Sequence, residues 1–145
     1  MKRKATFLTL LLFSVTVFAG KIVTKDVNML PDKAQEFITT YFPKLVIQKI
    51  EIEDELFESK TYEVDFTNGY EVSFDSKGMW YDVDCKKEEV PQAIVPTGIK
   101  EYLKVNFPGD IITQIEKERG GYEVELQSDL TLKFDKNGNF KKIDD

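Results

Sequence analysis

The chain has 145 residues, with 20 Lys and Arg against 26 Asp and Glu, no His and one Cys, and its formal net charge is −6. Without His, a Ser-His-Asp or Cys-His catalytic pair, a His-ligated zinc site and a 2-His-1-carboxylate iron site are excluded. An acidic chain that lacks a basic block would also repel the phosphates of nucleic acids. We therefore expect no nucleic-acid partner, no cofactor, no metal ligands and no catalytic residues.

Residues 1–20 have the pattern of a signal peptide. The basic residues Lys2–Lys4 precede an apolar run, Phe7–Phe18, and the small residues Ala19 and Gly20 follow. The run is shorter than the about 20 apolar residues that span a membrane. The pattern predicts a periplasmic or secreted protein, cleaved after Ala19 or Gly20 and without a membrane span after cleavage. The mature chain then has 17 basic and 26 acidic residues, a net charge of −9.

Cys85 has no partner for a disulfide within the chain. A lone thiol without a neighbouring base is more often inert than reactive, although a crosslink between chains is the alternative. The core must therefore stabilise the fold without a disulfide.

An internal repeat organises the rest of the sequence. Residues 30–51 align on 95–116 without gaps, and the alignment resumes five residues shorter at Tyr62, which matches Tyr122. The expected organisation is a signal peptide (1–20), an N-terminal segment (21–29), a first unit (30–85), a linker (86–94) and a second unit (95–145).

The first unit reads as a helix followed by four strands. Apolar residues at helical spacing lie between Pro31, which suits a first helical turn, and Pro43, which ends the helix. Strands are expected at 46–53, 62–66, 70–74 and 79–83, with a long acidic hairpin after the first strand and an Asn68-Gly69 hairpin after the second.

The second unit repeats this order. A helix is expected between Pro96 and Pro108, followed by strands at 111–118, 122–127, 130–134 and 139–143. In both units apolar and acidic residues alternate along the strands, so one face of the sheet is apolar and the other is acidic. The predicted fold class is α+β: two tandem helix-plus-four-strand repeats forming one antiparallel sheet of up to eight strands, with the helices on one face.

This repeat resembles the exported tandem PepSY-like domains that are described as β-lactamase-inhibitor-like. The resemblance covers nearly all of the mature chain. It depends on the paired helix ends and turns Tyr41-Phe42-Pro43, Asn106-Phe107-Pro108, Asp75–Trp80 and Asp135–Phe140. It implies an exported protein whose relatives bind or inhibit enzymes through a concave sheet face, and it brings no catalytic residues.

Two acidic patterns have simpler structural explanations. Asp135–Asn139 lacks the spacing of an EF-hand calcium loop and fits a β-turn. Glu63, Asp65, Glu123 and Glu125 share the acidic face, where the lack of burial favours a solvated surface over an acid–base pair.

Two apolar features distinguish the first unit. Leu56 and Phe57 lie in its acidic hairpin, and Trp80 and Tyr81 place two aromatic side chains in succession, so that one of them faces the acidic side unless a bulge intervenes. Local packing is the alternative interpretation of both pairs. Aromatic residues are nevertheless enriched at the centres of protein interfaces.

The leading hypothesis is a non-catalytic binding module, protein-binding or inhibitor-like, that uses the acidic sheet face and the first hairpin. Its acidic face favours an exported partner with a basic patch. The alternative is an envelope-associated structural or polymer-binding domain, and an enzyme is disfavoured by the absence of a nucleophile, a base or a metal cluster. The oligomeric state and the partner's identity stay open.

Overall fold

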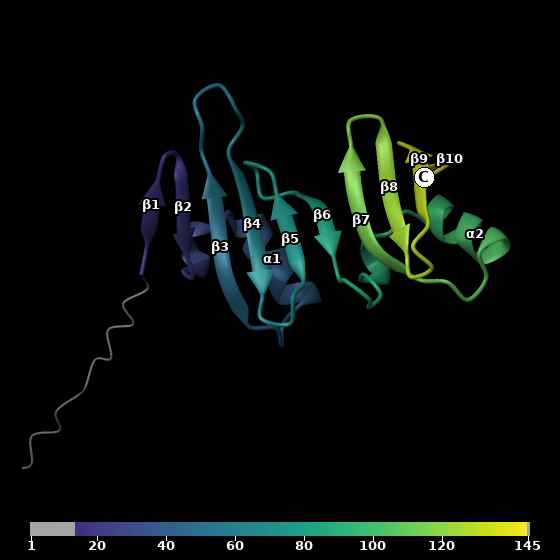
Figure 1. Cartoon of the computed structure of the whole chain (residues 1–145), viewed down its shortest axis with the longest axis horizontal. Helices are drawn as coiled ribbons and strands as arrows, with labels where there is room; N and C mark the ends of the chain where they lie inside the picture. Colours follow the sequence, from purple (N-terminus) through teal and green to yellow (C-terminus); the bar gives the residue numbers. More distant parts are fainter. Residues whose placement is uncertain (1–13, 145) are drawn as a thin grey trace, which may run out of the picture.

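The structure is a computed structural model that describes residues 14–144. One antiparallel sheet of ten strands follows the order of the chain, and each strand is hydrogen-bonded to the next (Figure 1). The strands are β1 (Thr16–Phe18), β2 (Lys21–Thr24), β3 (Ile47–Glu53), β4 (Thr61–Phe66), β5 (Glu71–Phe74), β6 (Trp80–Asp84), β7 (Ile112–Glu118), β8 (Gly121–Leu126), β9 (Thr131–Asp135) and β10 (Phe140–Asp144). The helices are α1 (Asp32–Tyr41) and α2 (Thr97–Asn106), with short 3₁₀ turns at Val27–Met29 and Gln92–Ile94. The α+β class is confirmed.

The expected limit of eight strands is wrong, because residues 16–24 add a hairpin at one edge of the sheet. β2, assigned to the N-terminal segment, places Ile22 opposite Ile52 and therefore extends the apolar face. β1 belongs to the predicted signal peptide and is exposed along its whole length. The rest of that segment, residues 1–13, lies outside the described part of the chain. Among residues 14–144, no helix is long and apolar enough to cross a membrane.

Both helices cover the same face of the sheet. In α1, Phe37 packs on Phe74 of β5 with ring centroids 5.6 Å apart. In α2, Tyr102 packs on Phe134 of β9 with centroids 5.5 Å apart. The strand register places Phe74 and Phe134 on one face of the sheet. The core therefore lies between this face and the helices. Neither of the two α-helices in the described part of the chain covers the opposite face, which we call the open face (Figure 1).

The core is a continuous apolar cluster along the sheet. Its fully buried members come from every strand between β3 and β9: Ile50, Ile52, Val64, Phe66, Val72, Phe74, Val83, Ile115, Val124, Leu126, Leu132 and Phe134. Burying each such side chain contributes about 1.5–3 kcal/mol, so the core holds the sheet together without a disulfide.

Two β-bulges set which side chains reach each face at the end of each unit. The register shifts between Phe74 and Ser73 opposite β6, so that Tyr81 is an extra residue without a direct partner. The same shift occurs between Phe140 and Lys142 in β10. A bulge changes the alternation of side chains locally, and this decides where Trp80 and Tyr81 point.

Candidate functional site: the open acidic face

The open face carries two rows of mostly charged side chains that run across the strands from β3 to β9. In the strand register, the first row is Glu51, Glu63, Ser73, Asp82, Glu116, Glu123 and Lys133, and the second row is Lys49, Asp65, Glu71, Asp84, Gln114, Glu125 and Thr131. Neighbouring strands lie about 4.8 Å apart, so carboxylates that face one another in these rows repel each other unless cations separate them.

Three lysines neutralise much of this charge. Lys49 Nζ lies 2.6 Å from Glu51 Oε1 and 3.1 Å from Asp65 Oδ2. Lys86 forms ion pairs with Glu71 and Asp84. Lys133 forms ion pairs with Glu118, Glu123 and Asp144. Both ends of the first row and the β3–β6 part of the second row are therefore compensated.

The centre of the first row is different. Glu63, Asp82 and Glu116 make no ion pair with any residue in the 14–144 range. Burial, followed by the charge of neighbouring carboxylates, raises the pKa of Glu63 and of Glu116. Burial also raises the pKa of Asp82, although Gln114 Nε2 donates a hydrogen bond to its carboxylate at 3.0 Å. We call these three residues the unpaired carboxylates.

Tyr81 lies beside them. Because of the bulge, its side chain points to the open face, where Glu51, Glu53, Thr61 and Glu63 form a shallow hollow of about 60 Å³ around it. Ser73, which lies between the two strands that carry Tyr81 and Glu63, is small enough to leave room for the ring. Burial raises the pKa of the Tyr81 hydroxyl.

Trp80 does not belong to the same surface. It pairs with Phe74 and lies on the helix side, 6.3 Å from Phe37 between ring centroids. Lys117 Nζ stands 3.7 Å from the centroid of its ring. The sheet therefore separates Trp80 from Tyr81, and of the two aromatic candidates only Tyr81 faces the acidic side.

Leu56 and Phe57 occupy the loop between β3 and β4, which extends past the other loops at that end of the sheet (Figure 1). Leu56 is 88% exposed, and Phe57 is fully exposed with φ of +73°. A non-glycine residue in this left-handed region costs about 1–2 kcal/mol. Neither side chain folds back on the core, so the packing alternative for this pair is wrong.

The acidic candidates all lie on the open face, but their surroundings differ. Glu63 is unpaired, Asp65 and Glu123 are bound to lysines, and Glu125 is exposed at the end of its row. Asp82 and Glu116 were missed as candidates. Asp82 is next to the apolar Val83, and Glu116 is next to the apolar Ile115. This alternation of polar and apolar residues could have predicted that both carboxylates lie on the open face.

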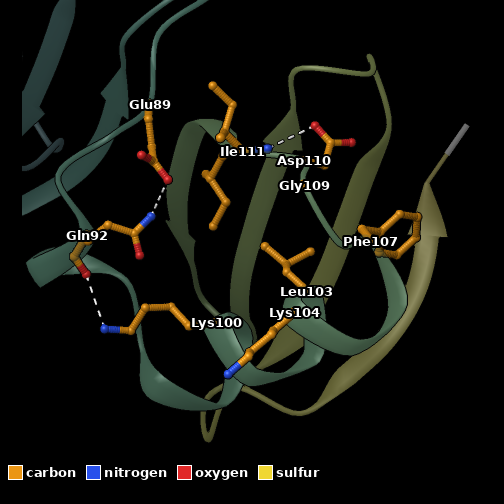
Figure 2. A pocket seen from close by; sticks show the side chains of 10 residues that line it. Glu89, Gln92, Lys100, Leu103, Lys104, Phe107, Gly109, Asp110 and Ile111 are labelled. Atoms are coloured by element: carbon orange, nitrogen blue, oxygen red, sulfur yellow. Dashed lines mark hydrogen bonds between the residues drawn. The ribbon is translucent and has the colours of Figure 1, made fainter.

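Other parts of the molecule offer weaker sites. A hollow of about 180 Å³ lies beside α2, where Lys100 donates to the Gln92 carbonyl at 3.4 Å and Gln92 bonds to Glu89 (Figure 2). Of its charged groups, Lys100 and Glu89 bond to the neutral Gln92, and Asp110 accepts a hydrogen bond from the Ile111 nitrogen. Cys85 is buried, and burial raises the pKa of its thiol to about 12, so the inert interpretation agrees with its surroundings. Within residues 14–144, no group of three His, Cys, Asp or Glu side chains could hold a metal ion.

Solved structures of three related proteins have the same fold. A crystal structure of a protein of unknown function from Bacteroides vulgatus is 40% identical, with a TM-score of 0.83, and the match covers 87% of this chain and all of that one. A second from Bacteroides vulgatus (41% identical) and one from Bacteroides thetaiotaomicron (40% identical, described as calcium-regulated) each have a TM-score of 0.78 and cover 83% of this chain and 94% of theirs. All three are described as putative periplasmic proteins.

The search of curated proteins found no match. A family described as "Putative beta-lactamase-inhibitor-like, PepSY-like" matches residues 60–142, which is more than half of the chain. The resemblance that the repeated helix ends and turns suggested is thereby confirmed. The chain belongs to the PepSY-like, β-lactamase-inhibitor-like family.

Proposed function

We propose that the protein is a non-catalytic periplasmic binding module whose open face engages a protein with a basic patch. The unpaired carboxylates carry this proposal. They lie side by side with other acidic groups, and burial and neighbouring charge already disfavour their ionised form. A lysine or arginine supplied by a partner would relieve this repulsion, and it would bind where none of the lysines within residues 14–144 forms an ion pair.

The β3–β4 loop adds an apolar contact to this electrostatic surface. Leu56 and Phe57 extend beyond the end of the sheet, and the Tyr81 hollow adjoins the base of the same hairpin at Glu53 and Thr61. Opposite charge speeds encounter and selects the partner, whereas a few exposed apolar anchors supply most of the affinity. The inhibitor-like family description and the periplasmic relatives agree with such a role.

The experiment compares the protein with the neutral isosteric variant Glu63→Gln/Asp82→Asn/Glu116→Gln as baits for the soluble periplasmic fraction. A control variant, Glu36→Gln/Glu101→Gln, removes two carboxylates from the helix side. We expect the native protein and the control to retain the same basic protein in a stoichiometric complex, and the neutral variant to lose it. Equal retention by all three baits would contradict the proposal.

Two competing functions are outcomes of the same design. The same three proteins are also mixed with the insoluble envelope fraction, and co-sedimentation with its polymer, without a protein retained from the soluble fraction, would support the polymer-binding alternative. Because one relative is described as calcium-regulated, calcium chloride is titrated against the native protein by calorimetry. Saturable calcium binding that disappears in the neutral variant would assign the unpaired carboxylates to a cation rather than to a protein.

A further inference from the structure

A third hollow lies on the helix side of the sheet, between α1 and the turn that joins β5 to β6. Its volume is about 430 Å³, within the range of about 300–1,000 Å³ that small-molecule sites occupy. Phe37, Tyr41, Met79 and Trp80 supply its apolar lining, and Lys33 and Glu36 its polar edge. The apolar side chain of Met79 is 43% exposed to solvent.

The second unit has the corresponding residues in a closed arrangement. Tyr102 and Phe140, which align with Phe37 and Trp80, stack at a centroid distance of 4.5 Å and an interplanar angle of 8°. Phe37 and Trp80 are 6.3 Å apart and tilted by 36°. In the second unit the ring that covers the helix aromatic comes from the last strand. In the first unit Tyr41 of the same helix lies closest to Phe37, with centroids 4.7 Å apart, and Trp80 stays farther away.

Lys117 accounts for the difference. Its side chain comes from β7, on the helix side of the sheet, and places Nζ 3.7 Å from the centroid of the Trp80 ring. A cation over an indole ring is attracted to its face. The contact engages Trp80 from the β7 side, whereas the hollow lies toward α1.

The apolar lining is particular to the first unit. Tyr41 and Met79 align with Asn106 and Asn139, which are polar. The second unit forms the same helix and strands with these polar residues. Folding of the second unit thus does not require a thioether at the position of Met79. Tyr41 packs on Phe37, with centroids 4.7 Å apart, and it also lines the hollow together with Met79, where a ligand could contact both side chains.

We propose that this aromatic hollow is a binding site for a small planar aromatic molecule. A flat ring placed against Tyr41 and Trp80 makes the kind of ring contact that Phe140 makes with Tyr102, and the Met79 sulfur adds a favourable contact with a ring edge. The site lies on the opposite side of the sheet from the open face. It is therefore independent of the proposed protein-binding function.

Trp80 is the single Trp of the chain, so its indole N–H gives one identifiable nuclear magnetic resonance signal in ¹⁵N-labelled protein. Unlabelled indole is the probe. We expect a saturable shift of the Trp80 signal, and a dissociation constant at least about tenfold weaker in Met79→Asn and in Tyr41→Asn, which introduce the second unit's residues. Met79 is partly exposed, so Met79→Asn keeps the test valid if the Tyr41 variant unfolds.

The matched control is Val105→Asn, which removes an apolar side chain of 77% exposure from α2. It should bind indole like the native protein. A shift that rises linearly without saturation, or equal binding by Met79→Asn, would overturn the proposal. Tighter binding of the pentapeptide Gly-Gly-Trp-Gly-Gly than of indole would also overturn it, because the occupant would then be a side chain of a partner protein.

Discussion

Replacement of Gly78 by Ala should destabilise the protein more than the same replacement at Gly109 or Gly138. All three glycines have nearly the same left-handed backbone, with φ of +78°, +83° and +80°. An added Cβ at Gly78 would lie 2.8 Å from Pro31 Cβ and 3.0 Å from the Ala34 nitrogen, where α1 begins. At Gly109 it would meet nothing within 4 Å, and at Gly138 its nearest neighbour would be 3.4 Å away.

The two contributions can therefore be separated. The left-handed conformation costs a residue with a side chain about 1–2 kcal/mol, and this cost is common to the three sites. Overpacking against a helix that cannot shift freely adds about 1–3 kcal/mol at Gly78 alone. We expect a loss in the free energy of unfolding of about 1–2 kcal/mol for Gly109→Ala and Gly138→Ala, and of about 2–5 kcal/mol for Gly78→Ala.

Urea unfolding followed by circular dichroism measures these losses, and an unchanged m-value would show that the unfolded states are comparable. Equal losses at the three positions would refute the steric reasoning. A stable Gly78→Ala protein would refute the assignment of the turn itself.

Three further predictions concern the surface and the thiol. Neutral isosteres at Glu63, Asp82 and Glu116 should each raise the free energy of unfolding at pH 7 by about 0.2–1 kcal/mol. Because folding raises the pKa of these three carboxyl groups, the stability of the native protein should also rise as the pH falls from 7 toward about 5. A melting temperature that falls over this pH range would contradict this expectation. Phe57→Ala should leave the free energy of unfolding within about 0.5 kcal/mol of the native value while weakening partner binding by about 2 kcal/mol in calorimetry, and unchanged affinity would remove the loop from the interface. Cys85 should react with a thiol reagent at pH 8 only after unfolding in urea, and neither chelator nor reductant should lower the melting temperature; rapid labelling of the folded protein would show that the thiol is accessible.

Alternation was enough to predict the open face but not its most important details. The pattern of β4 and β8 placed Glu63 and Glu123 on the side away from the helices, as the register confirms. It could not locate the bulge at Tyr81, because β6 has only five residues, too few for the inverted alternation beyond one extra residue to be recognised. The assignment of Trp80 to one face therefore had to come from the structure.

The expected strand count failed for a related reason. Residues 16–18 have the pattern of the end of an apolar signal sequence. They form β1 only by pairing with β2, and the four residues of β2 are too few for their pattern to predict a strand. The ion pairs also could not be predicted from the sequence. Lys49 and Lys133 each reach across strands, and only the register shows which carboxylates they leave unpaired.

The order of the strands has a consequence for how the chain folds. Each strand of the sheet pairs only with its neighbours in the order of the chain. Most strand pairs are therefore closed by short hairpins, and only the connections from β2 to β3 and from β6 to β7, which contain the helices, are longer. Folds with such local contacts form faster than those that must join remote segments. A chain that is delivered from its N-terminus can add one strand at a time to an edge that already exists. An early strand can therefore form its pairing before the later strands have been delivered. The next strand then pairs with the edge that is exposed.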